Sequence, residues 1–173
     1  MPIKIIIDDS KGLYQQYDAS SGGVVGIKQT RSASGIAAGD NGLIVSDAIT
    51  IPANSLITNY HAVVTSQLVF AAASDVGIRF GNSSAGTDDT YVALVADGTA
   101  TGVATLDVGQ GNSTNTAVST SLDAANENTA LTAVAGAQKI GAADVDIYGS
   151  LVAVEDIDAG GTVQFVVEFI TFS

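Results

Sequence analysis

Residues 145–169 read VDIYGSLVAVEDIDAGGTVQFVVEF, and this stretch decides the fold class. Apolar residues or glycine at positions 145, 147, 149 and 151 alternate with Asp146, Tyr148 and Ser150, which is the two-residue period of a half-exposed strand. After the turn sequence Asp-Ala-Gly-Gly at 158–161, apolar residues at 163, 165, 167 and 169 repeat that period. The stretch therefore predicts two strands, and we expect them to pair with each other as antiparallel neighbours.

The same strand pattern continues toward the N-terminus. Ile49, Ile51 and the apolar run 56–70 flank a turn at 52–55, Pro-Ala-Asn-Ser, in which proline fixes φ and Asn54 tolerates a left-handed backbone. Apolar residues at 76, 78 and 80 alternate with glycine and Arg79, which predicts another half-exposed strand. The pattern at residues 91–96 is compatible with a short capped helix that ends before Gly98, and equally with a strand. Weaker strand patterns occur at 103–108, 117–122 and 131–134.

About eight short strands, separated by Gly, Asn and Asp turns and without an amphipathic helix, predict an all-β fold. We expect an antiparallel β-sandwich, jelly-roll-like, with an extended N-terminal arm. Residues 1–35 combine a short β-prone run at 3–7 with the flexible sequence Ser-Ser-Gly-Gly at 20–23. They predict an arm or edge strand for docking, and residues 36–173 predict the sandwich body. The alternative is that the N-terminal residues form the first strand pair of a single domain.

The charge of the chain is strongly asymmetric. The formal net charge is −12, from 18 acidic and 6 basic residues. A surface that binds nucleic acid needs clustered lysine and arginine, so we expect no nucleic-acid partner. Lys4, Lys11, Lys28 and Arg31 lie in the first 31 residues, whereas Arg79 and Lys139 are the only basic residues after them. The N-terminal part is thus weakly positive, and the body is strongly negative.

Composition also bears on stability and location. Hydrophobic residues make up 46% of the chain but aromatic residues only 6%, so we expect a thin core, built largely from Ala and Val. Such a core favours completion by a neighbouring subunit, and hence an oligomer. The apolar run at the N-terminus is too short for a signal peptide, and the longest apolar stretch, 62–73, is too short for a membrane helix. We expect a soluble protein without a membrane partner.

Catalytic and metal-binding patterns are weak. The chain has no cysteine and one histidine, His61, so neither a zinc shell nor a hydrolase triad is expected. Residues 144–155 follow the spacing of a calcium-binding EF-hand loop, except that Tyr148 stands at the fifth position. The stretch has a strand pattern, where that loop needs flanking helices, so we interpret the match as chance. We expect no enzyme activity, no cofactor and no metal site.

Two segments resemble small phage virion proteins of the decoration, cement or head-fibre type. The first is AITIPANSLITN at 48–59, followed by an apolar strand to Phe70 and by VGIRFG at 76–81. The second is IDAGGTVQFVVEF at 157–169, which looks like the closing hairpin of that group, with Asp158 where threonine is more usual. The resemblance implies a jelly-roll-like body, frequently trimeric, in a virion.

The functional hypothesis is a structural virion protein, assembled in the host cytoplasm, that decorates or cements the capsid. Its expected partners are the major capsid protein and its own copies, with a homotrimer favoured. The weakly basic N-terminal part is expected to dock onto the capsid through Lys4, Lys11, Lys28 and Arg31. The alternative is a carbohydrate-binding or host-adhesion module of a phage fibre, which would use Tyr91, Tyr148 or the polar loops.

Overall fold

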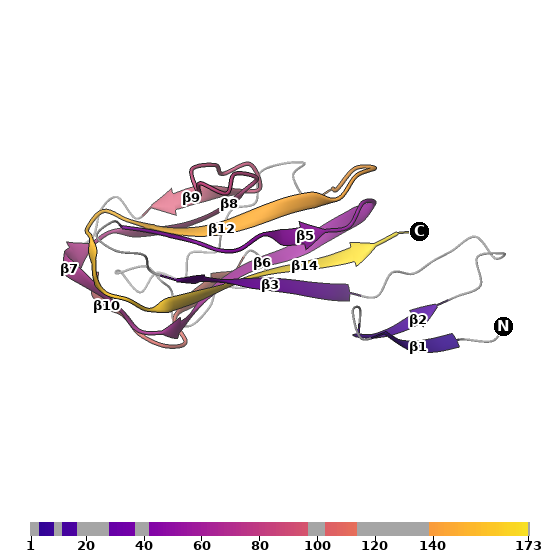
Figure 1. The fold of residues 1–173 in the computed structure, drawn as a ribbon, viewed down its shortest axis with the longest axis horizontal. Coiled ribbons are helices and arrows are strands. Elements are labelled where there is room, and N and C mark those ends of the chain that lie inside the picture. Colours follow the sequence, from indigo (N-terminus) through magenta and orange to yellow (C-terminus); the bar gives the residue numbers. More distant parts are fainter. Residues whose placement is uncertain are drawn as a thin grey trace.

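Two antiparallel sheets lie face to face in the computed structural model, which describes residues 4–8, 12–16, 28–36, 42–96, 103–113 and 139–172 (Figure 1). The elements in these residues are all strands. The strands of the first sheet, in the order β11-β6-β14-β3, are Gly111–Ser113, Ser55–Ser66, Thr162–Thr171 and Lys28–Ile36. The strands of the second, in the order β4-β12-β8-β9, are Leu43–Val45, Val145–Ala153, Val76–Gly81 and Val92–Ala96. This confirms the predicted all-β antiparallel sandwich.

The edge of the second sheet is made by two short strands in succession. β4 pairs with one part of β12, and β5 (Ile49–Ile51) pairs with the preceding part, from Val145 to Ile147. Between them, Ser46 forms a bridge to Gly35 at the edge of the first sheet. The two main sheets are therefore linked along this side.

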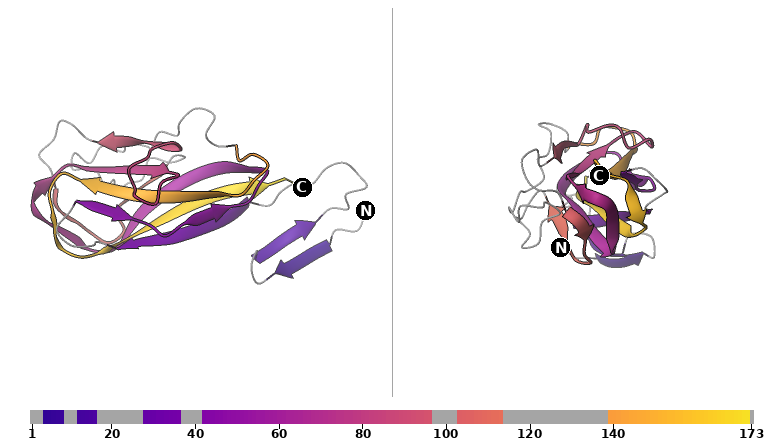
Figure 2. Two further views of the ribbon diagram at one scale, coloured as in Figure 1. Left: turned by 45° about the horizontal axis from the view of Figure 1, so that its top comes forward. Right: turned by 90° about the vertical axis from the view of Figure 1, so that its left-hand side faces the viewer.

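A third, smaller sheet closes one end of the sandwich. It consists of β10 (Val103–Leu106), β7 (Leu68–Ser74) and β13 (Ile157–Ala159), in that order. The chain passes through β7 on its way from β6 to β8, and through β13 on its way from β12 to β14 (Figures 1 and 2). This small sheet is thus where the chain crosses between the two main sheets.

The N-terminal strands β1 (Lys4–Asp8) and β2 (Gly12–Gln16) form an antiparallel hairpin, with Ile6 opposite Tyr14. Among the described strands, the two pair only with each other. The next described strand, β3, belongs to the body, because it pairs with β14 from Lys28 to Ile36.

The core lies between the two main sheets. The alternation in β14 places Val163, Phe165, Val167 and Phe169 fully inside, at 0% exposure. The ring of Phe80, from the opposite sheet, lies 5.8 Å from that of Phe165 in an edge-to-face arrangement, which is favourable for aromatic pairs. Gly149 on β12 lies beneath Phe165, and an added Cβ there would come within 2.2 Å of the ring. A glycine is therefore needed for the two sheets to approach each other at this point.

Two expectations from the sequence are wrong. The described core consists mostly of Ile, Val and Phe, with Ala62 as the single buried alanine among its members, so it is not built largely from Ala and Val. β12 and β14 are not an antiparallel pair, because β12 pairs with β4, β5 and β8, whereas β14 pairs with β3 and β6. The period of a strand fixes which residues face inward, but it does not determine which strand lies alongside.

Other expectations are decided by the backbone. Asn54 has a φ of 55°, as the turn sequence predicted. The segment left open between helix and strand is a strand, β9, and β10 corresponds to the start of the segment 103–108. The strand candidates at 117–122 and 131–134 lie outside the described residues.

Candidate functional site

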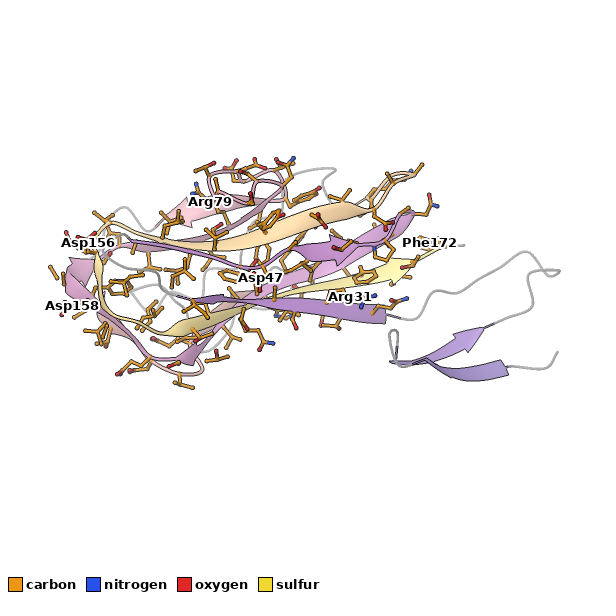
Figure 3. All side chains as sticks on the ribbon, viewed as in Figure 1. Arg31, Asp47, Arg79, Asp156, Asp158 and Phe172 are labelled. Carbon is orange, nitrogen blue, oxygen red and sulfur yellow. The ribbon has the colours of Figure 1, made fainter. Side chains whose placement is uncertain are left out.

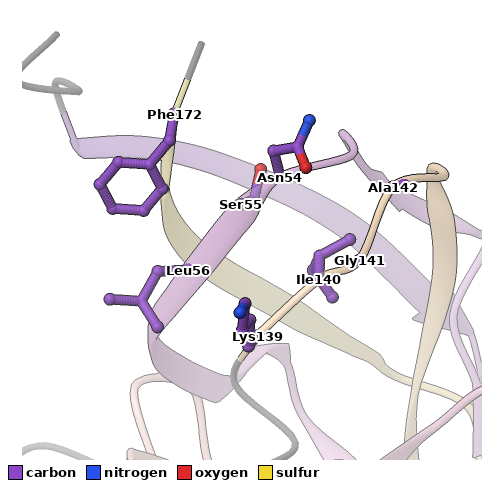
Figure 4. A pocket seen from close by; sticks show the side chains of 8 residues that line it. All are labelled: Asn54, Ser55, Leu56, Lys139, Ile140, Gly141, Ala142 and Phe172. Carbon is purple, nitrogen blue, oxygen red and sulfur yellow. The ribbon is translucent and has the colours of Figure 1, made fainter. Parts of the chain in front are cut away.

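An open groove lies at the end of the sandwich where the C-terminus emerges (Figure 4). Its volume is about 520 Å³. Three segments that are far apart in the sequence line it: the start of β6, the residues just before β12, and the residue after β14. The lining residues are Asn54, Ser55, Leu56, Lys139, Ile140, Gly141, Ala142 and Phe172.

Backbone hydrogen bonds hold these three segments together. The amide of Phe172 donates to the carbonyl of Asn54 over 2.9 Å, and the amide of Asn54 donates to the carbonyl of Gly141 over 2.7 Å. The amide of Ile140 donates to the carbonyl of Ser55 over 2.8 Å. The left-handed conformation of Asn54 reverses the chain so that both neighbouring segments can reach it. The groove is therefore built on a fixed backbone.

The groove is apolar, with one cation at its edge. Leu56 is 39% exposed and Phe172 is 47% exposed, whereas Ile140 is buried. Lys139 is exposed and is the one charged residue in the lining. An apolar surface of this kind suits the packing of a protein segment, with Lys139 placed to attract a carboxylate.

The opposite end of the sandwich is acidic. The turns around the small sheet carry Asp75, Asp107, Glu155 and Asp156, and its strand β13 carries Asp158. Residues 65–75, 103–110 and 154–161 contain no lysine or arginine. Figure 3 labels Asp156 and Asp158 at this end, beside β7. Val108 and Val154 are exposed among these acids, at 66% and 75%.

Hydrogen bonds hold these acidic turns in place. The hydroxyl oxygen of Ser74, which is 1% exposed, accepts from the amides of Val154 and Glu155, each over 3.0 Å. The side chain of Gln67 donates to a carboxylate oxygen of Asp107 over 2.6 Å.

The predicted docking residues are distributed between the hairpin and the body. Lys4 is the first residue of β1, and Lys11 lies outside the described residues. Lys28 and Arg31 belong to β3, the edge strand of the first sheet. Arg31 is half-buried, and together with Thr50 and Asp144 it lines a second, polar pocket of about 380 Å³. The division of the chain at residue 35 stays a prediction.

His61 lies on the outer face of the first sheet. Its Nε2 is 2.7 Å from Nδ2 of Asn59 and 3.5 Å from a carboxylate oxygen of Glu168. Glu168 stands opposite Asn59 in the pairing of β14 with β6, so the sequence around His61 does not reveal this contact.

The carboxylates of the calcium-like segment are engaged in structural contacts. A carboxylate oxygen of Asp144 accepts from the amide of Ala53 over 2.8 Å, and one of Asp146 accepts from the hydroxyl of Thr50 over 2.6 Å. Residues 145–153 form β12, which confirms the strand pattern. No cluster of three or more potential metal-ligating side chains occurs among the described residues.

The two tyrosines of the adhesion alternative are not prominent at the surface. Tyr91 is 9% exposed, and desolvation by burial, together with the nearby Asp88, raises the pKa of its hydroxyl. Tyr148 is half-buried on β12, opposite Gly81. Neither therefore offers a fully open ring to a sugar.

No protein-family model and no curated protein matches this sequence. Among solved structures, the chain is similar to one described as a cyanophage Pam1 capsid asymmetric unit. The sequence identity is 12%, the TM-score is 0.45, and the match covers 87% of this chain and 90% of the other. The described residues contain no helix that could span a membrane.

Proposed function

We propose that this chain is a structural protein of a phage virion, which decorates or cements the capsid by binding the major capsid protein and neighbouring copies of itself. The order of strands in the two main sheets supports the proposal, together with the two segments that resemble phage virion proteins. With β4 and β5 counted as one strand, the main-sheet strands along the chain are β3, β4/β5, β6, β8, β9, β11, β12 and β14. The first, third, sixth and eighth of these, β3, β6, β11 and β14, form one sheet. The other four, β4/β5, β8, β9 and β12, form the second.

This division of the eight strands between two sheets supports a jelly roll, in which eight strands are divided between two packed sheets. Jelly rolls occur in viral capsid domains, and also in lectins and cupins, so the fold alone does not determine a function. The two segments that resemble phage decoration proteins supply the distinction. They fall on two separate parts of the sandwich, from β5 to β8 and from β13 to β14.

The attachment would involve the end of the sandwich that bears the groove. β3 begins at this end, so all residues before Lys28 are tethered there (Figure 1). In this proposal Lys4 and Lys11 dock onto the capsid, with Lys28 and Arg31 at the base of the tether. The acidic end would then face away from the shell and keep the free protein soluble. A homotrimer on the virion is the assembly we favour.

Co-sedimentation with purified capsids of the encoding phage tests this proposal. The full chain should pellet with capsids, whereas Lys4→Glu combined with Lys11→Glu should reduce binding by at least about tenfold, because each reversal places like charge against an acidic surface. Lys4→Arg combined with Lys11→Arg is the matched control and should bind like the parent. Equal binding by the reversed and the control variants would contradict the docking role of these lysines.

The alternative of a carbohydrate-binding or host-adhesion module has less support, since the rings of Tyr91 and Tyr148 are buried and half-buried. Binding of the purified protein to a glycan array, together with its absence from the capsid pellet, would favour this alternative.

A further inference from the structure

We infer that the groove at the end of the sandwich binds the hairpin β1–β2 of a second copy of this chain. The inference specifies how neighbouring copies contact each other. It rests on the proposed function only because that function includes such a contact. Its test needs no capsid, so its failure would leave the capsid assignment standing.

The groove has the surface of an interface. Burial is described for residues 29–36, 42–92, 104–111 and 139–172, and two of the five large hydrophobic side chains exposed among them, Leu56 and Phe172, lie in this one groove. They come from different segments and are held in position by the backbone bonds to Asn54 and Ser55 (Figure 4). Grouped apolar exposure on a fixed backbone is typical of a site that packs against another protein surface.

The hairpin, for its part, needs a surface to pack on. A two-stranded hairpin is marginally stable in water on its own, and β1 and β2 pair with no other described strand. Ile5 and Ile7 share one face of the ribbon with their register partners Gln15 and Leu13. That face carries no charged residue type, so it matches an apolar groove.

The charges fit as well. β1 ends at Asp8 and is followed by Asp9, and Lys139 stands at the edge of the groove. Asp8, like Lys4 and Ile6, belongs to the other face of the ribbon, so no charged residue of β1 lies on the face that meets the apolar lining. Lys4 belongs to the other face of the ribbon, one residue out of phase with Ile5, and it is left available to the capsid.

The point at which the hairpin is joined to the body permits exchange between two copies. The hairpin is joined to the body at Lys28, at the same end as the groove (Figure 1). Two copies that meet at this end can each insert a hairpin into the groove of the other, and this reciprocal contact buries two grooves at once. Higher closed assemblies can form when each hairpin enters the groove of the next copy.

The first measurement is the solution mass of the full chain by light scattering over a range of concentrations. The parent should form an oligomer. Leu56→Asp and Phe172→Asp in the groove, and Ile5→Asp and Ile7→Asp in the hairpin, should each raise the dissociation constant by at least about tenfold, because each places a charge in an apolar contact. The matched controls are Val108→Asp and Val154→Asp, two exposed apolar residues at the other end, which should leave the mass unchanged.

A mixing experiment then identifies the occupant. A groove variant (Leu56→Asp with Phe172→Asp) and a hairpin variant (Ile5→Asp with Ile7→Asp) should each be monomeric alone, with the melting temperature of the folded body retained. When mixed, they should form a heterodimer, because one intact hairpin meets one intact groove. A parent that is monomeric, as it would be if its own chain covered the groove, overturns the inference. Two monomeric variants that stay monomeric after mixing overturn it as well.

Discussion

The two ends of the sandwich are built in opposite ways. At one end the small sheet β10-β7-β13 closes the fold, and its turns carry acids and no basic residue. At the other end three segments meet around an apolar groove beside Lys139, and the C-terminus and the tether to the hairpin emerge there. The first end completes its own packing. The second leaves Leu56 and Phe172 exposed together in one groove, whereas the exposed valines of the first end lie among acidic residues, and we therefore assign attachment to the groove end.

The largest expected difference between the ends is in core packing. Leu68 in β7 is 0% exposed, whereas Phe172 at the groove is 47% exposed. Leu68→Ala should lower the free energy of unfolding by about 2–5 kcal/mol, because it leaves a cavity in the closed end. Phe172→Ala should cost less than about 1 kcal/mol in the monomer. Urea unfolding of both variants at low protein concentration checks this, and equal losses would contradict the division into a closed and an open end.

The next effect concerns the hydrogen bonds that hold the acidic turns. Ser74→Ala removes the side-chain acceptor of the Glu155 amide and one of the two acceptors of the Val154 amide, and it should destabilise the fold by about 1–3 kcal/mol. Ser66→Ala, on an exposed residue of β6, is the matched control and should stay within about 0.5 kcal/mol. Denaturant titration of both variants gives the comparison. If Ser66→Ala lowers the free energy of unfolding as much as Ser74→Ala does, the hydrogen bonds to the buried hydroxyl contribute no particular stability.

At the open end the sensitive element is the backbone of Asn54. Its φ of 55° is strained for most residues, so Asn54→Ala should cost about 1–2 kcal/mol. Asn54→Gly should have a much smaller effect, because glycine adopts this conformation freely. Thermal melts of the two variants test this prediction. If alanine and glycine behave alike, backbone strain is not what shapes the groove.

Asp88 lies in the connection between β8 and β9, outside both ends of the sandwich. Its substitution should have the smallest effect on stability. The amide of Asn82 and the side chain of Thr90 donate to its carboxylate and hold its pKa below the usual value. A lowered pKa in the folded state means that this stabilisation is present above the unfolded pKa and is lost as the pH falls through the folded pKa. Asp88→Asn should therefore flatten the loss of stability in acid, as measured by melts across the acid range. Asp89→Asn is the matched control and should leave the curve unchanged.

The sequence predicted local features better than spatial ones. The strands around Ile78, Ile147 and Phe165, and the turn at Asn54, follow from periodicity and from residue preferences that act over a few positions. The partner of β14 could not be predicted in this way, because residues 154–161 carry the chain into the opposite sheet.

The candidate site could not be predicted from the sequence for the same reason. Leu56, Lys139 and Phe172 are separated by long stretches of chain, and no local pattern joins them. The contact of His61 with Glu168 likewise depends on the pairing of two distant strands. Charge asymmetry did direct attention to the N-terminal part, although Lys28 and Arg31 proved to lie in β3.

The central claim is that the chain attaches to a capsid by the groove end, and the most direct measurement is the orientation of the protein on the particle. Cryo-electron microscopy of capsids saturated with the full chain should show the long axis of the sandwich directed away from the shell. The end with Phe172 and the hairpin tether should face the shell, and the end with Asp156 and Asp158 should face solvent. A map in which the acidic end contacts the shell, or in which saturated capsids carry no added density, would contradict the account.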